Sequence, residues 1–460
     1  MRGEGSAVGH GPEKDHPDYA ESTTNIRRVI DSDNLPQELT YAPLVAGLSR
    51  PSPSSSHDPP SLSQVEVDRD LSELEPEPDP SICILPEYID NLRGNVGSQD
   101  QQYLWLKGAL TLPDDHLRSP LVDCFVEYVH PTMPVVDLRE FLGALHDCGN
   151  SSRPRISCLL FQAVMFSAVS YADLTILLNA GFASRRAARK LFHERAKLLY
   201  DLDVEQRPLV QVQALALLSH CTRLPGQIKE GWHWLGIAIS VAFSLGLHQT
   251  RSGSPGDQPV SRQARRIWWT LYVRDRQQAQ YLSRPMRIRD DEFDTPPLTL
   301  EDFDLENLEE LHLPHLPFTS RKTLRRSIQT NQTMIFIKMT ELYFHINGVL
   351  TTHFSILSWK KSVAASEQLY STSPTAWMMR RMRPEADIEG QHSRLTRWFA
   401  GLPPNCRYRA PSPAEIARTG GGSLLGHLTL LHIAFHNTIS TLHRFRAIPP
   451  HQASTFTLRE

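Results

Sequence analysis

The feature that most constrains the fold is a succession of long segments in which apolar residues recur at spacings of three and four. Such spacing places apolar side chains on one face of an α-helix. Between these segments there are no alternating, β-branched runs of the kind that form strands. We therefore predict an all-α fold. The segments cover residues 119–130, 155–180, 183–201, 208–222, 232–248, 262–282, 328–350, 388–400 and 424–445.

The first of these segments, SPLVDCFVEYVH, has a predicted starting point. Ser119 is a suitable N-cap, Pro120 suits the first helical position, and Asp123 places a negative charge near the positive end of the helix. The sequence therefore predicts that a helix begins at Ser119.

The segment 262–282 contains the string RRIWWTLYVRDR, with two adjacent tryptophans between arginine pairs. Trp268 and Trp269 point about 100° apart on a helix, so together they widen its apolar stripe. We predict a core helix whose arginines pair with Asp275 or with partners elsewhere. The stripe consists of Ile267, Trp268, Leu271, Tyr272, Asp275, Gln278, Ala279 and Leu282.

The amino-terminal part has a different composition from the rest. Residues 1–80 hold 16 acidic and 6 basic side chains and 11 of the 34 prolines, with little apolar periodicity. We predict a disordered acidic arm over 1–80, a linker and entry segment over 81–110, and an all-α domain over 111–460. The remaining residues carry 42 basic and 35 acidic side chains, a bias too weak to require nucleic acid by charge alone.

Cysteine usage and hydropathy indicate the compartment. The six cysteines lie far apart with no C-x-x-C pair, which excludes a zinc module built from such pairs and a dense disulfide framework. The first residues have no apolar signal core, and the longest apolar run, 235–247, is too short to span a bilayer. We expect reduced thiols in the nucleus or cytosol.

One string matches a catalytic motif. DDEFD at 290–294 fits the D-D-x-x-D that binds magnesium and diphosphate in all-α terpene synthases. That motif needs carboxylates one turn apart on a continuous helix, whereas Pro285 precedes the string and Pro296 and Pro297 follow it. We predict a loop, and the enzyme hypothesis rests on this string alone.

Three weaker patterns have plain structural interpretations. His432, His436 and His443 form a helical stripe, which we interpret as partly buried packing rather than a metal site. The glycine string at 419–426 lacks the spacing of a phosphate loop and is interpreted as a flexible connector. The basic clusters 184–190 and 321–326 have the composition of nuclear import or phosphate-contact segments, and each is also compatible with a solvated helix face.

The string at 265–303, RRIWWTLYVRDRQQAQYLSRPMRIRDDEFDTPPLTLEDF, resembles the central signature of the fungal-specific transcription factor domain. This domain is the regulatory middle region of zinc-cluster transcription factors. Segments 125–142, 231–249 and 428–444 support the resemblance, and YLWLKGALTLP at 103–113 with LLFQAVMFSAVSYADL at 159–174 is most similar to the cutinase transcription factor branch. The resemblance covers roughly residues 83–445.

The resemblance implies a nuclear regulator of RNA polymerase II genes, with no catalytic residue, metal ligand or cofactor in this chain. Its expected partners are the transcription machinery and related factors in a homo- or heterodimer. Family members carry upstream a six-cysteine cluster that binds two zinc ions and places a helix in the major groove, and residues 1–82 contain no cysteine. We expect zinc and direct DNA contact only through such a module, missing here or supplied by a partner.

Two alternatives remain open from the sequence. One is a paralogue deficient in DNA binding that titrates a full-length factor, and the other is a metal-dependent helical enzyme that uses DDEFD. The resemblance assigns the family signature, interpreted as structural, to Trp232, Gly246, Arg266, Trp268, Trp269, Asp275, Arg276, Arg284, Pro285, Asp291, Asp294 and Pro297.

Overall fold

The predicted all-α fold is confirmed in the computed structural model. It describes residues 85–92, 96–146, 155–220, 231–250, 258–282, 284–303, 305, 324, 326–353, 388–410 and 422–443. Within these ranges the regular elements are helices, and the pairing of Ile89 with Ile156 is an isolated β-bridge outside any strand. All of these ranges belong to one compact unit, residues 63–460. The predicted acidic arm, 1–80, lies outside the described residues.

The helices follow the apolar periodicity closely in most places. In chain order they are α2 (Ser98–Leu106), α3 (Asp115–Cys124), the π-helix η3 (Phe125–Val129), α4 (Leu138–His146), α5 (Cys158–Ala168), η4 (Val169–Tyr171), α6 (Leu174–Asn179), α7 (Arg185–Asp201), α8 (Pro208–Leu218), α9 (Gly231–Ser244), α10 (Gln258–Leu282), η5 (Leu300–Asp302), α12 (Arg326–His353), α14 (Ile388–Ala400), η7 (Pro404–Cys406) and α16 (Gly422–His443).

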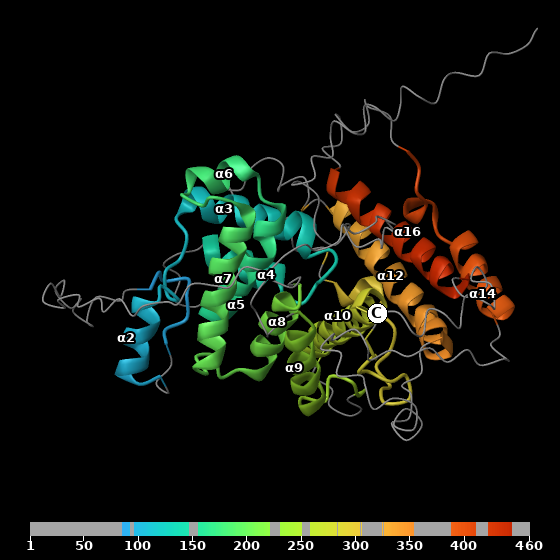
Figure 1. The fold of residues 1–460 in the computed structure, drawn as a ribbon, viewed down its shortest axis with the longest axis horizontal. Coiled ribbons are helices and arrows are strands. Elements are labelled where there is room, and N and C mark those ends of the chain that lie inside the picture. Colours follow the sequence, from blue (N-terminus) through green and yellow to red (C-terminus); the bar gives the residue numbers. More distant parts are fainter. Residues whose placement is uncertain are drawn as a thin grey trace, which may run out of the picture. The chain divides into compact units, whose positions relative to one another are not determined.

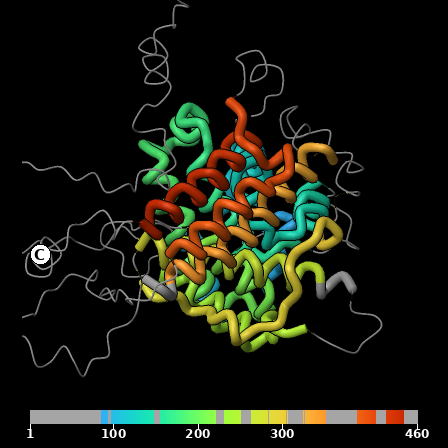
Figure 2. The backbone as a smooth tube through the Cα atoms, turned by 90° about the vertical axis from the view of Figure 1, so that its right-hand side faces the viewer, coloured from blue at the N-terminus to red at the C-terminus, as the bar shows by residue number. Residues whose placement is uncertain are grey.

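Two groups of helices pack around α10 (Figure 1). In the first group, α5 is buried along its whole length because α3, α7 and α8 pack against it, and α9 packs on α8. In the second group, α12, α14 and α16 each contact the other two and lie side by side (Figure 2). Helix α10 contacts α8 and α9 on one side and α12 on the other. It therefore joins the two groups.

Helix α10 is buried on all sides through its middle turns. Every residue from 266 to 276 is buried, including the arginines at 266, 274 and 276. This burial exceeds the single stripe predicted from the sequence, and Leu282 of that stripe is 41% exposed. A helix that is buried all round must also bury polar side chains, so each of these needs a partner.

The prediction that a helix begins at Ser119 is wrong. Helix α3 begins at Asp115, with Asp114 as its N-cap: the Asp114 carboxylate accepts a hydrogen bond from the Leu117 backbone N–H at 3.1 Å. Pro120 consequently lies inside the helix, where it removes one backbone donor. Asp114 is as good a capping residue as Ser119, and its cap leaves the apolar Leu117 in the buried face.

The segment 155–180 is not one continuous helix. Helix α5 ends at Ala168, the short 3₁₀ turn η4 follows, and α6 begins after Asp173. The Asp173 carboxylate accepts a hydrogen bond from the Thr175 backbone N–H at 2.7 Å and so caps α6. An aspartate that bonds its own neighbouring backbone competes with helix continuation, which explains the break.

The glycine string was wrongly interpreted as a connector over most of its length. Helix α16 begins at Gly422, so residues 422–426 are helical, while 419–421 lie outside the described residues. Ser423 is buried and hydrogen-bonds to Glu127 of η3. The first turn of α16 therefore contacts η3 through Ser423.

Candidate functional site

The aromatic side chains of α10 hold the loop that follows it. Phe293, from the DDEFD string, lies 5.5 Å from Trp268 and 5.7 Å from Trp269 between ring centroids. Tyr272 is 5.5 Å from the same ring. The Trp269 indole N–H also donates to the Pro296 carbonyl at 2.8 Å. The adjacent tryptophans therefore hold the loop against the helix, although residues 291, 292, 294, 296 and 297 are exposed.

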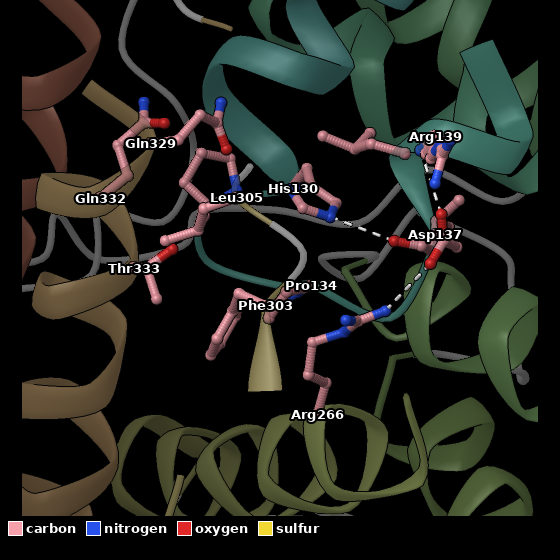
Figure 3. A pocket seen from close by; sticks show the side chains of 13 residues that line it. His130, Pro134, Asp137, Arg139, Arg266, Phe303, Leu305, Gln329, Gln332 and Thr333 are labelled. Carbon is pink, nitrogen blue, oxygen red and sulfur yellow. Dashed lines mark hydrogen bonds and ion pairs between the residues drawn. The ribbon is translucent and has the colours of Figure 1, made fainter. Parts of the chain in front are cut away.

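Arg266 connects α10 to a small cavity (Figure 3). Its Nη1 donates to the Asp302 carbonyl at 2.8 Å, and its Nη2 lies 3.4 Å from the Asp137 carboxylate. The cavity has a volume of about 40 Å³. Its wall comes from the segment 130–139, from Arg266, from Phe303 and Leu305, and from α12 through Gln329, Gln332 and Thr333.

One histidine of this wall is neutral. His130 donates from Nε2 to the Val136 carbonyl at 3.1 Å. Burial, and secondarily the nearby Arg266 charge, lower the pKa of His130 to about 4. The imidazole is therefore uncharged at neutral pH.

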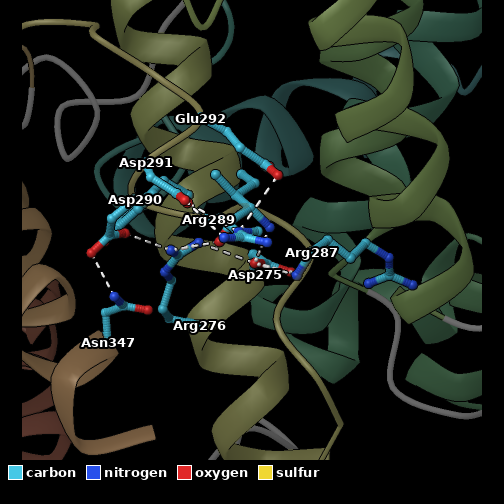
Figure 4. Close-up of polar contacts among 10 residues, drawn as sticks. Asp275, Arg276, Arg287, Arg289, Asp290, Asp291, Glu292 and Asn347 are labelled. Atoms are coloured by element: carbon cyan, nitrogen blue, oxygen red, sulfur yellow. Dashed lines mark hydrogen bonds and ion pairs between the residues drawn. The ribbon is translucent and has the colours of Figure 1, made fainter. Parts of the chain in front are cut away.

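Asp275 and Arg276 form a buried ion pair that fixes the start of the loop (Figure 4). Asp275 Oδ2 accepts from Arg276 Nη1 at 3.1 Å and from the backbone N–H groups of Arg287 at 2.9 Å and Ile288 at 3.1 Å. Burial raises the pKa of Asp275, while Arg276 and the two backbone donors act in the opposite direction. The pairing of Asp275 with an arginine of its own helix was among the predicted possibilities.

Asp290 links three elements. Its Oδ1 accepts from the Tyr272 hydroxyl and from Arg276 Nη2, both at 2.9 Å, and its Oδ2 accepts from Asn347 Nδ2 of α12 at 2.5 Å (Figure 4). Arg276 also stacks on Tyr272, 3.6 Å from the ring centroid. Asp290 is thus the residue through which the loop contacts both α10 and α12.

Two other carboxylates of the DDEFD string, those of Asp291 and Asp294, bond to residues outside this cluster. Asp291 forms an exposed ion pair with Arg289 at 2.7 Å, and Asp294 accepts from the Thr250 backbone N–H at 2.6 Å. Residues 290–294 form no helix, as predicted. In the ranges that the structure describes, no group of three His, Cys, Asp or Glu side chains is arranged to hold a metal ion.

Trp232 packs beneath two arginines of the loop. The Arg287 guanidinium lies 3.4 Å and that of Arg284 4.8 Å from its ring centroid, and Arg287 Nη2 donates to the Trp232 carbonyl at 2.9 Å. Gly236, one turn later on α9, leaves room for Arg287, since an added Cβ would lie 3.1 Å from that guanidinium. Burial lowers the pKa of Arg287 to about 10.

The other signature residues occupy the turns around this cluster. Gly246 has a φ of +70°, a left-handed conformation that ends α9 and that glycine adopts without strain. Pro285 is partly buried, and Pro297 is exposed. The signature residues therefore lie in α9, in the turn after it, in α10 and in the loop that follows α10, and Asp291 and Pro297 among them are exposed.

Several partners of the signature residues, and of their neighbours Arg265 and Asp290, were not singled out from the sequence. These contacts pair Asp290 with Asn347 and Arg265 with Asp302. They also pair Arg266 with Asp137 and Trp232 with Arg287. Asn347 lies 57 residues from Asp290 and Asp137 lies 129 residues from Arg266. No local pattern marks such distant polar residues as partners.

The basic cluster 184–190 is partly used inside the fold. Arg189 is buried and donates to the His220 carbonyl, and Arg185 donates to the Ala172 carbonyl at 2.8 Å. Only Arg186 and Lys190 are exposed among its basic side chains. Of the cluster 321–326, all but Leu324 and Arg326 lie outside the described residues.

The predicted partial burial of the histidine stripe of α16 is confirmed at two of its three positions. His432 and His443 are partly buried, whereas His436 is exposed. His443 hydrogen-bonds to His392 of α14 at 2.9 Å. These histidines therefore take part in packing between α14 and α16.

The cysteines for which the structure gives an environment are free thiols. Cys124, Cys158 and Cys406 are in this state, while Cys83, Cys148 and Cys221 lie outside the described residues. Burial raises the pKa of Cys124 to about 12 and that of Cys406 to about 11, so both thiols stay protonated at neutral pH. Among the described helices, none is long and apolar enough to cross a membrane.

Comparison with known proteins identifies the family. Residues 122–398 match the fungal specific transcription factor domain. The chain belongs to this family. It is 34% identical over 394 residues to Cutinase transcription factor 1 beta of Fusarium vanettenii, covering 84% of the chain and 43% of that relative. The resemblance found in the sequence, including that to the cutinase transcription factors, is confirmed.

Two further relatives extend the comparison. The chain is 32% identical to a protein named Transcription factor from Fusarium pseudograminearum, over 78% of the chain and 40% of the relative. It is 30% identical to Transcription factor cpaR of Aspergillus oryzae, over 80% and 60%. The chain thus spans about half the length of these curated relatives. No solved structure matches it significantly.

Proposed function

We propose that the chain is a nuclear transcriptional regulator of RNA polymerase II genes and that residues 111–460 form its regulatory domain. The observation that carries this proposal is the family match over residues 122–398, together with relatives that are themselves named transcription factors. In this proposal the domain acts beside a zinc-cluster DNA-binding module, in the same polypeptide or in a dimerising partner, and contacts the transcription machinery.

We propose a structural role for the signature residues rather than catalysis. Arg276 and Asp275 hydrogen-bond to each other and to the loop backbone, and Arg276 also bonds to Asp290. Trp268 and Trp269 are buried against Phe293. Buried charges that hold each other in place are typical of a rigid core. This role supports a regulator more than the enzyme hypothesis, because the DDEFD carboxylates bond to protein groups: Asp290 to Arg276, Asp291 and Glu292 to Arg289, and Asp294 to Thr250.

A reporter assay tests the proposal directly. The full chain fused to a heterologous DNA-binding domain should change transcription of a reporter that carries the matching site, relative to the DNA-binding domain alone. A matched fusion with Trp269→Ala should lose this effect in proportion to its loss of folded protein, while Trp105→Ala, on the exposed face of α2, should retain it. A folded, nuclear fusion that leaves the reporter unchanged would contradict the proposal.

Metal and DNA binding of the isolated chain form a second test. The 460 residues contain no C-x-x-C pair to hold a zinc cluster, so the purified chain should contain no stoichiometric zinc. Specific duplex binding should appear only when a partner with a zinc cluster is added. Weak, salt-sensitive association is compatible with the proposal, because phosphate contacts give affinity without sequence information. Two zinc ions per chain or a strongly preferred site would contradict the expectation that these 460 residues lack a DNA-binding module.

A further inference from the structure

Two histidines of the second helix group face each other where α14 packs on α16. His443 is the last residue of α16, and His392 lies one turn into α14. His443 Nε2 and His392 Nδ1 are 2.9 Å apart, and the planes of the two rings are inclined by 69°. Both side chains are partly exposed. Two nitrogens that are able to bind a metal therefore meet at a place near the surface of the fold.

We infer that His392 and His443 together bind a divalent copper ion. A neutral imidazole has one protonated nitrogen and one nitrogen with a free lone pair, and the latter is a metal ligand. The present hydrogen bond requires a proton on one of the two facing nitrogens. When this proton moves through water to the other nitrogen of the same ring, both facing lone pairs become available. Two waters then leave the hydrated ion, two Cu–N bonds form, and no net proton is released.

The separation of the two nitrogens favours copper over zinc. Imidazole nitrogens bind such ions at about 2.0–2.1 Å, so two of them at a right angle are about 2.8–3.0 Å apart. At the tetrahedral angle that Zn²⁺ prefers, they are about 3.3–3.4 Å apart. The distance of 2.9 Å matches the right angle of tetragonal Cu²⁺. Cu²⁺ also has the highest affinity for nitrogen ligands among the divalent first-row metals.

A small movement of the two rings completes the site. In a straight hydrogen bond both lone pairs lie along the line between the nitrogens. Each ring must therefore tilt by about 45° to direct its lone pair at an ion beside that line. The end of a helix yields to such a movement more readily than its middle, and His443 ends α16. The backbones of α14 and α16 can thus keep their packing.

The structure favours this pair over the pair that sequence spacing suggests. His432 and His436 are one helical turn apart on α16. However, His432 Nε2 lies 3.0 Å from the Cys406 carbonyl oxygen, so this nitrogen already has a partner in the protein. His443 instead meets His392, 51 residues away in the chain. Since the described residues supply no group of three His, Cys, Asp or Glu for a metal, water must fill the other positions around the ion.

A copper ion at this site stabilises the second helix group. It ties α14 to α16, and these two helices lie side by side (Figure 2). The two nitrogens meet only in the folded chain, so binding raises the melting temperature. Because the right angle disfavours Zn²⁺, the purified chain is still expected to hold no stoichiometric zinc. The inference goes beyond the proposed regulatory role, and copper binding to the purified chain is measured without any transcription assay.

Titration of the untagged, metal-free full chain with Cu²⁺ tests the inference. At half an equivalent of Cu²⁺, electron paramagnetic resonance should show two coordinated imidazole nitrogens. One equivalent should raise the melting temperature. Ni²⁺ and Zn²⁺ should each bind more weakly than Cu²⁺. A copper spectrum with one coordinated imidazole or none would overturn the inference, and this measurement needs no variant.

Variants locate the site. His392→Gln and His443→Gln each keep a hydrogen-bonding group but leave a single imidazole. Each should bind Cu²⁺ at least about tenfold more weakly than the parent, because even the loss of a group that only supports a metal ligand typically costs about 10–100-fold in affinity. His436→Gln changes an exposed histidine of the same helix and should bind as the parent does. Parent-like binding in both folded pair variants would indicate an adventitious ion only and overturn the inference. Loss of binding in His436→Gln would place the ion elsewhere and overturn it as well.

Discussion

Arg276 Nη2 of α10 lies 2.9 Å from Asp290 Oδ1 in the loop that follows, and the same guanidinium stacks 3.6 Å above the Tyr272 ring. Because Asn347 of α12 donates to the other oxygen of Asp290, this carboxylate links the loop to both α10 and α12. The DDEFD string, which suggested a magnesium site, contributes Asp290 and Phe293 to the packing of the domain instead.

Replacing Arg276 by alanine should destabilise the fold strongly. The substitution leaves Asp275 buried without its cationic partner and removes one donor from Asp290, and breaking a buried pair in this way typically costs about 3–5 kcal/mol. Urea unfolding measures the loss. Arg289→Ala, which breaks an ion pair between two exposed side chains, should leave the midpoint unchanged within error and serves as the control.

Trp269→Ala should also lower stability, by about 3–5 kcal/mol, because truncating a core tryptophan leaves a cavity. Trp269 is 5% exposed and loses its contacts with Tyr272 and Phe293 together with its bond to the Pro296 carbonyl. Trp105→Ala, at a position that is 46% exposed, should change the melting temperature little. Equal melting temperatures for the two variants would show that Trp269 does not hold the core.

The double variant Asp290→Ala, Asp294→Ala separates the structural role from the magnesium hypothesis. Calorimetry should detect no specific magnesium binding to the parent or to the variant, because these carboxylates bond to Arg276, Asn347 and Thr250. The variant should be less stable than Asp291→Ala, whose carboxylate is exposed. Magnesium-dependent release of diphosphate from an isoprenoid substrate, abolished by the double change, would instead support an enzyme.

The contribution of His427 to stability should fall as the pH drops from 7 to 5. His427 of α16 donates from Nε2 to the Tyr128 carbonyl, and burial lowers its pKa from 6.5 to about 4. Between those pH values the unfolded chain binds more protons than the folded chain, so acid favours unfolding. The expected loss for this residue is about 2 kcal/mol between pH 7 and pH 5.

Urea unfolding of the parent and of His427→Gln at both pH values checks this prediction. The comparison isolates one residue, because the lowered pKa of His130 and the raised pKa values of Glu127 and Asp275 act in both proteins. The variant should lose less stability than the parent on acidification. An identical pH dependence in both proteins would show that His427 is not buried in its neutral form.

The sequence alone determined the fold class, the place of most helices and the family. Helical periodicity is a local property, so it predicted α14 at residues 388–400 and, within a few residues, α7 and α10. It failed where two residues could cap a helix. Asp114 rather than Ser119 caps α3, and Asp173 caps α6 and so divides the segment 155–180. Each alternative cap is locally acceptable, and the packing of the apolar face selects between them.

Only the tertiary structure decided which polar residues are partners. From the sequence, Asp291 and Asp294 belong to the family signature and Asp290 does not, yet Asp290 is bound to Arg276 and Asn347 while Asp291 is exposed to water. Likewise nothing near Gln332 in the chain indicates that it lines the same cavity as Arg266. The free energy of a polar side chain depends on its burial and on the groups that surround it, and those groups come from helices far apart in the sequence.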